Sequence, residues 1–187
     1  MTCLRSYLDA SKWAKIALTL LMVNTSMAWN SFVSATWGDG YTTGPVFVGY
    51  GLWRRCGNSE TAPNCVNLLG WNLQWYRTVQ AFAIMAFVCV NVCYLLMILL
   101  VFLNRCKGSK AISLWICVLS FFSALCYLVA VTVFAASFDD DFTVTGASST
   151  SLAFGWIMTI IVALVQVLVG VFMILEARRM GAKVMDL

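Results

Sequence analysis

Two cysteines, Cys56 and Cys65, stand nine positions apart in the polar stretch GLWRRCGNSETAPNC, which covers residues 51–65 of an otherwise apolar chain. A pair of thiols in such a segment forms a disulfide in an oxidising compartment and stays reduced in the cytosol. Cys89 and Cys93 form a second close pair, one helical turn apart, but no histidine or carboxylate joins them, so we expect no metal site there. The chemistry of the polar stretch therefore depends on the compartment that it faces.

The composition is that of a membrane protein. Hydrophobic residues make up 61% of the 187 residues and charged residues only 11%, whereas soluble domains have about 25% charged residues. Crossing a bilayer as a helix takes about 20 apolar residues. Four charge-free stretches are long enough, and they lack the polar and apolar alternation of membrane-barrel strands; they are residues 16–38, 78–104, 111–138 and 142–175.

We predict one domain, an all-α membrane four-helix bundle that carries a small extracellular antiparallel β-sheet. The first outer loop is rich in β-branched and aromatic residues, and its segments 46–53 and 64–69 are predicted to pair with each other. The predicted bounds are helices at about 15–36, 78–103, 112–138 and 152–175, outer loops at about 37–77 and 139–151, an inner loop at 104–111 and a tail at 176–187.

The positive charges predict that both termini are cytoplasmic. Nine of the twelve Lys and Arg residues fall in the N-terminal tail, the inner loop or the C-terminal tail, and such residues beside helix ends stay on the cytoplasmic side. The inner side has nine basic and three acidic residues and the outer side three basic and five acidic, so their net charges are +6 and −2. The overall charge is a topology signal and predicts no nucleic-acid partner.

An alternative concerns the first helix. Residues 18–23, followed by Ser26-Met27-Ala28, also fit a signal peptide that is cleaved before Trp29. The apolar stretch continues past that point to Trp37, which favours a membrane helix that is retained.

This orientation places Cys56 and Cys65 together, without other cysteines, on the oxidising side of the membrane. We therefore predict a disulfide between them, which closes a loop of about ten residues and stabilises the sheet by about 2–3 kcal/mol. Two free thiols are the alternative. Cys3 and Cys106 lie in cytoplasmic segments next to the membrane, where they are candidates for S-palmitoylation, with an unmodified thiol as the alternative.

The layout and one motif resemble the claudin / peripheral myelin protein / epithelial membrane protein superfamily. The motif consists of Gly51, Leu52 and Trp53 followed by Cys56 and Cys65, with a tryptophan upstream and an arginine just before the second helix. Arg77 matches the arginine, and either Trp37 or Trp29 matches the tryptophan, with the spacing to Trp53 favouring Trp37. The layout matches over the whole chain, and the branch of the superfamily stays open.

The resemblance implies a structural or adhesive function at cell–cell contacts in the plasma membrane. Claudins form paracellular barriers and ion-selective pores by self-association in cis and in trans, and this is the leading hypothesis. The alternative is an auxiliary subunit of an ion channel or receptor, of the calcium-channel gamma or AMPA-receptor regulatory type. The ending Met185-Asp186-Leu187 is a weak candidate for binding a PDZ-type scaffold. The lipid bilayer is the partner that the composition itself implies.

Charged residues on the outer side are candidates for an ion path or for contacts with neighbouring molecules. A fixed charge in a narrow aqueous pore selects ions by sign, and a solvated loop is the alternative at each position. The candidates are Arg54, Arg55, Glu60, Asp139, Asp140 and Asp141. We expect no enzymatic activity and no cofactor, because the chain has no histidine and no charged residue deep in a predicted span that could act as a general base.

Several other polar residues and glycines are predicted to have structural roles. Asn24, Asn91 and Gln166 lie at membrane depth, where we expect hydrogen bonds between helices. Arg77 is expected to bind backbone carbonyl groups of the sheet or a carboxylate. Gly155 and Gly170 are expected to permit close packing of helices.

Overall fold

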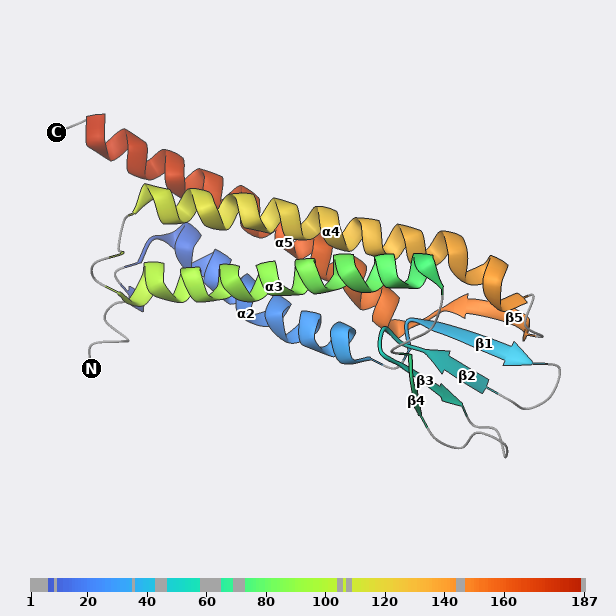
Figure 1. Cartoon of the computed structure of the whole chain (residues 1–187). Helices are drawn as coiled ribbons and strands as arrows, with labels where there is room; N and C mark the ends of the chain where they lie inside the picture. Colours follow the sequence, from blue (N-terminus) through green and yellow to red (C-terminus); the bar gives the residue numbers. More distant parts are fainter. Residues whose placement is uncertain are drawn as a thin grey trace. The chain divides into compact units, whose positions relative to one another are not determined.

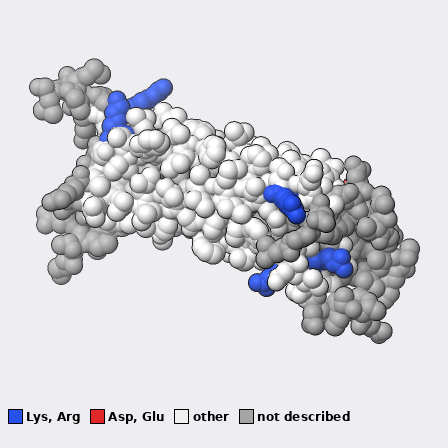
Figure 2. Space-filling view, in the orientation of Figure 1, with Lys and Arg blue, Asp and Glu red and all other residues white. Residues whose placement is uncertain are grey.

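The computed structural model describes residues 7–8, 10–34, 36–42, 47–57, 65–68, 73–103, 106, 109–143 and 147–185. Among them, four helices are long and apolar enough to cross a membrane, as predicted. They are α2 (Lys12–Val33), α3 (Gln74–Phe102), α4 (Lys110–Thr143) and α5 (Phe154–Met185) (Figure 1). On the face seen in Figure 2, most of the described surface carries neither basic nor acidic side chains. The chain is therefore a multi-pass membrane protein, whose helices satisfy their own backbone hydrogen bonds in lipid.

The predicted sheet is present, with five strands in the order β4-β3-β2-β1-β5 and every neighbouring pair antiparallel. The strands are β1 (Gly38–Thr42), β2 (Phe47–Tyr50), β3 (Arg54–Gly57), β4 (Val66–Asn67) and β5 (Ala147–Leu152). The predicted pairing of segment 46–53 with segment 64–69 is wrong, because β2 pairs with β3 and β3 in turn pairs with β4. A turn splits segment 46–53, and the Gly51 N–H donates to the Arg54 carbonyl at 2.8 Å as β3 folds back on β2.

The second outer segment also differs from the loop that we predicted at 139–151. Helix α4 continues to Thr143, and β5 then adds to the sheet beside β1 (Figure 1). The helix continues because Phe138 is buried in the core, stacked on Phe134 with ring centroids 4.9 Å apart and edge-on to Tyr50 at 5.6 Å. Tertiary packing thus extends the helix into a segment whose polar sequence indicates a loop.

The described chain divides into two compact units. The helical unit comprises Met1–Ser26, Ala86–Leu125 and Val162–Leu187, and the sheet unit comprises Met27–Met85 and Cys126–Ile161. Each of the four helices is divided between the units, with one segment in each.

In the helical unit, α2 and α5 run antiparallel around a core that includes Leu21, Met97 and Met173. The Ser11 hydroxyl caps the N-terminus of α2 by accepting a hydrogen bond from the Ala14 N–H at 3.1 Å. The same hydroxyl donates to Glu176 Oε2 on α5 at 2.5 Å. This bond joins the beginning of one membrane helix to the end of another.

The polar residues at membrane depth behave differently from our prediction. Asn24 and Gln166 are completely buried in the helical unit, yet their amide groups have no hydrogen-bond partner among the described residues. Asn91 Nδ2 donates to the Phe87 carbonyl of its own helix at 2.8 Å. Within the described residues, Asn24 and Gln166 therefore do not form the predicted hydrogen bonds between helices. Gly170 does permit close packing, since a Cβ at this position would lie 2.9 Å from the Phe121 ring.

The sheet unit has a separate core that is rich in aromatic side chains. Trp37, Tyr76, Phe134 and Phe138 are its largest buried members. Their rings meet edge-on or stacked at centroid distances that favour aromatic pairs, such as 5.6 Å between Trp37 and Phe134. These contacts place the sheet directly on the helix segments of its own unit.

Candidate functional site

The predicted disulfide between Cys56 and Cys65 is present. Cys56 lies on β3, and Cys65 immediately precedes β4, an edge strand of two residues. In the described residues, two residue pairs join β3 to β4, and so short a ladder has little stability of its own. The disulfide therefore keeps the edge strand on the sheet. Glu60 lies in the intervening segment, outside the described residues.

Gly51-Leu52-Trp53 forms the turn from β2 to β3, and helix α3 binds two of its carbonyl groups. The Tyr76 hydroxyl donates to the Gly51 carbonyl, and Gln80 Nε2 donates to the Leu52 carbonyl at 2.7 Å. Tyr76 and Gln80 are four residues apart and so lie on one face of the helix. Sequence reasoning missed both residues. The sequence feature that could have identified them is a pair of hydrogen-bonding side chains, one turn apart, at the start of an apolar helix.

Arg77 binds no carbonyl group of the described sheet, which is one of the two roles that we predicted for it. Its side chain is exposed and forms no hydrogen bond or ion pair with another described residue. Each residue of a helix is rotated by about 100° from the one before it. The Arg77 side chain therefore points away from the helix face that Tyr76 and Gln80 share. Those two side chains take the role that we expected of the arginine.

Trp37 links β1 to the helices of the sheet unit. Its indole is completely buried, and Nε1 donates to the Ser31 carbonyl at 2.9 Å. The ring packs edge-on against Phe134, and the backbone N–H donates to the Tyr50 carbonyl at 2.6 Å. Trp29, in contrast, is 51% exposed on α2. This difference supports Trp37 as the tryptophan of the motif.

Two glycines permit the close approach of the sheet to its helices. A Cβ at Gly38 would lie 2.3 Å from Phe138 Cζ, and a Cβ at Gly155 would lie 2.6 Å from Trp37 Cδ1 and 2.9 Å from the Thr36 carbonyl oxygen. No larger residue fits either place without moving an aromatic ring or the backbone. The prediction for Gly155 is confirmed, whereas Gly38 was not identified from the sequence.

Arg54 and Arg55 expose their charges on β3. Adjacent strand residues point to opposite faces, so the two guanidinium groups leave the strand in different directions. Arg55 lies opposite Tyr50 in the ladder. Burial raises the pKa of the Tyr50 phenol, and the nearby Arg55 charge lowers it by a smaller amount. Neither arginine forms an ion pair within the described part of the chain.

The acidic run Asp139-Asp140-Asp141 occupies the last turns of α4, not a loop as predicted. The Asp139 side chain is exposed, and the side chains of the other two lie outside the described part of the structure. The C-terminal end of a helix carries partial negative charge. Acidic residues there strengthen a negative field, which is opposite in sign to the charge on β3.

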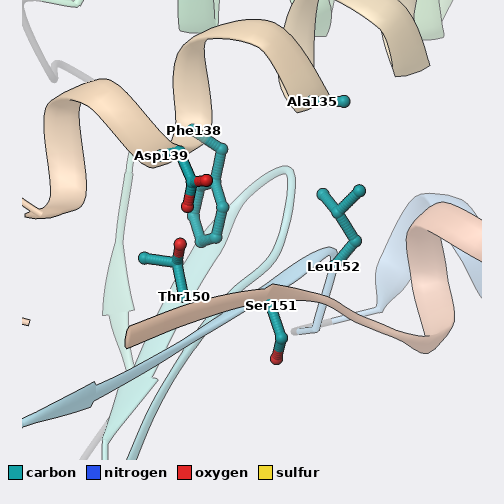
Figure 3. A pocket seen from close by; sticks show the side chains of 6 residues that line it. All are labelled: Ala135, Phe138, Asp139, Thr150, Ser151 and Leu152. Atoms are coloured by element: carbon teal, nitrogen blue, oxygen red, sulfur yellow. The ribbon is translucent and has the colours of Figure 1, made fainter. Parts of the chain in front are cut away.

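A small pocket of about 100 Å³ lies between the end of α4 and strand β5. Figure 3 shows the Asp139 carboxylate directed toward the Thr150 hydroxyl, while Ser151 points away to the other face of the strand. The lining residues are Ala135, Phe138, Asp139, Thr150, Ser151 and Leu152. These residues combine apolar side chains with two hydroxyl groups and one carboxylate.

Asp39 is a partly buried carboxyl group in the middle of the sheet. It lies on β1 opposite Gly49 of β2 and Ser151 of β5. Its Oδ1 atom is buried without a hydrogen-bond partner among the described residues. This burial raises the pKa of Asp39 above its ordinary value of 3.8.

The variant Asp39→Asn is expected to be more stable than the wild type at neutral pH. Because the folded carboxyl has the higher pKa, wild-type stability falls as the pH rises from 3.8 through that raised value and then stays lower. An amide does not ionise, so the variant should lose this dependence and gain about 1–2 °C in melting temperature. Thermal unfolding in detergent across this pH range measures the effect. An unchanged pH dependence in the variant would contradict it.

The other predicted site residues are Cys106, Cys3 and the C-terminal ending. Cys106 is a free, half-buried thiol between α3 and α4, and its acylation stays a prediction. Cys3 and the last two residues of the proposed PDZ-type ending lie outside the described residues. Within the described residues, no group of three His, Cys, Asp or Glu side chains could hold a metal ion.

A disulfide-linked antiparallel sheet carried by four membrane helices defines a tetraspan membrane protein of the claudin type. Residues 7–173 match the PMP-22/EMP/MP20/Claudin family, and the chain belongs to this family. Its members are structural membrane proteins, and the match does not specify a branch. None of the curated proteins matches the chain.

Proposed function

We propose that this protein is a claudin-like structural protein of cell–cell contacts in the plasma membrane. In this proposal both termini are cytoplasmic, the sheet is extracellular, and the molecules associate in cis and in trans to form a barrier or an ion-selective pore. Family membership supports a structural role in the membrane. The concentration of Lys and Arg in the two tails and in segment 104–111 supports the orientation.

The observation that carries the proposal is a sheet that is packed firmly on the helix segments of its own unit and exposes two charged side chains on strand β3. Trp37 and Tyr76 are buried at its base, and Gln80 binds the β2–β3 turn. Arg54 and Arg55 remain exposed on β3. A preorganised surface loses little conformational entropy when it binds, so such a sheet is suited to contact the sheet of another molecule.

The charges suggest how a pore would select ions. Guanidinium groups beside a narrow aqueous path attract anions and repel cations. Arg54 and Arg55 would therefore favour anions where β3 lines the path. The acidic end of α4 has the opposite sign and is suited to meet a basic surface on a neighbouring molecule.

A mixed-cell contact assay tests the proposal. The tagged protein is expressed in cells without junctions of their own, and these are mixed with non-expressing cells. The proposal expects enrichment at contacts between two expressing cells and none at contacts with a non-expressing cell. The paired variant Arg54→Gln/Arg55→Gln should reduce this enrichment, whereas Arg178→Gln/Arg179→Gln, which neutralises two exposed arginines near the end of α5, should not.

An even distribution of the wild type would overturn the proposal and favour an auxiliary subunit of a channel or receptor. The outward side of α3 exposes Val88, Val92 and Leu95 by 52%, 38% and 56%. Lipid accounts for such a surface, and a foreign membrane helix would fit it as well. Copurification of a channel would then be the next measurement.

A further inference from the structure

The helical unit contains two buried amide groups that its own side chains and backbone do not satisfy. Asn24 of α2 and Gln166 of α5 are both 0% exposed, and neither the oxygen nor the nitrogen of either amide has a hydrogen-bond partner among the described residues. Next to Asn24, the hydroxyl of Thr25 is also buried and has no hydrogen-bond partner in the described part of the chain. Almost all buried polar groups in proteins are hydrogen-bonded, so these residues require a ligand.

Each of the two amides lies on the core-facing side of its helix. Asn24 follows Leu21 by three residues, and Gln166 precedes Val169 by three residues, so each amide shares a helix face with its neighbour. Leu21 and Val169 belong to the same buried core cluster. Both amides therefore point toward the interior of the helical unit.

They also lie at similar levels along the helices. The Ser11–Glu176 hydrogen bond sets a common reference for the antiparallel pair. At 1.5 Å per residue, Asn24 lies about 20 Å and Gln166 about 15 Å from that bond. Their levels along the helix axes therefore differ by about 5 Å, or one helical turn.

The surroundings favour a neutral ligand that both donates and accepts hydrogen bonds. No charged residue occurs between Lys15 and Asp39 or between Asp141 and Glu176, so neither helix has a formal charge near the amides. An ion at this depth would lose its hydration without a counter-charge. Each amide offers donors and acceptors together, which matches water.

We infer that Asn24 and Gln166 form an internal water-binding site within the membrane-spanning part of the helical unit. One or two water molecules bridge the amides of α2 and α5. The hydrated pair links the two helices in place of a direct bond between side chains. The site is independent of any contact that the sheet makes with another molecule.

Nuclear magnetic resonance on the intact protein in lipid nanodiscs tests the site without a substitution. The side-chain amide protons of Gln166 should show cross-peaks to long-lived water, and Asn24→Leu should weaken them. Asn91 is the control, because its Nδ2 donates to the Phe87 carbonyl in the same unit. Absence of water cross-peaks at both Asn24 and Gln166 in the wild type would overturn the inference.

A double-mutant cycle gives a second, independent readout. Asn24→Leu or Gln166→Leu alone leaves one buried amide with fewer partners, so each should lower the melting temperature by roughly 3–6 °C. The double variant should lose much less than the sum of the two, because it removes the whole polar group. Strictly additive effects, or stabilisation by each single variant, would mean two independent unsatisfied amides and would also overturn the inference.

Discussion

Alanine in place of Trp37 is expected to lower the free energy of unfolding by about 3–5 kcal/mol, the loss typical of a large aromatic residue removed from a core. The substitution deletes the contact with Phe134 and the hydrogen bond from Nε1 to the Ser31 carbonyl. It also leaves a cavity beside Gly155, the residue that lets α5 approach the Trp37 ring closely. Total stabilities are about 5–15 kcal/mol, so much of the variant should fail to reach the cell surface.

Trp29→Ala is the matched control for this prediction. It removes the same side chain from a position that is 51% exposed, and it should change stability by less than about 1 kcal/mol. Thermal unfolding in detergent and surface labelling of cells measure both variants. Equal losses at the two positions would show that the core described around Trp37 does not carry the stability of the sheet unit.

The second large effect is expected from the double variant Cys56→Ser/Cys65→Ser. The disulfide contributes about 2–3 kcal/mol by the loop-closure argument, and the two-residue strand β4 depends on it for its place in the sheet. We expect a sharp fall in surface delivery, since cellular quality control retains proteins with unfolded segments. Replacing both residues avoids an unpaired thiol, which would form disulfides with other molecules.

Cys89→Ser is the control for the disulfide variant. Cys89 is a free cysteine on α3, and its replacement by serine should leave surface delivery close to that of the wild type. Surface biotinylation normalised to total protein compares the two. Wild-type surface levels in the double variant would contradict the stabilising role of the disulfide.

The membrane helices and the disulfide could be predicted because each depends on a local or compositional property. A charge-free apolar run must be helical in lipid whatever its neighbours are. The topology that follows leaves Cys56 and Cys65 as the cysteines in the first outer loop. Neither conclusion requires knowledge of which residues far apart in the chain meet.

Strand pairing and the end of α4 could not be predicted in the same way. The segment that forms β5 reads ASSTSL, which has no strand pattern, and it becomes a strand by pairing with β1, more than a hundred residues away in the chain. Helix α4 continues through three aspartates because Phe138 is buried against Tyr50. In both segments, long-range packing overrides local preference.

The residues that hold the sheet show the same division. The motif directed attention to Arg77, whereas the geometry gives this role to Tyr76 and Gln80. The rotation of the helix decides which of these neighbouring side chains faces the β2–β3 turn. A sequence motif does not say where that turn lies in space, so it could not identify the right side chains.

From the sequence alone follow the four membrane spans, the side of the membrane proposed for each loop, the single disulfide and the family resemblance, because hydrophobicity, charge and cysteine count act through the solvent or the compartment. The tertiary structure decides that Trp37 rather than Trp29 enters the core, that β5 completes the sheet, and that the amides of Asn24 and Gln166 are buried without a hydrogen-bond partner among the described residues. These features depend on which side chains meet across distant segments, and close packing makes that choice.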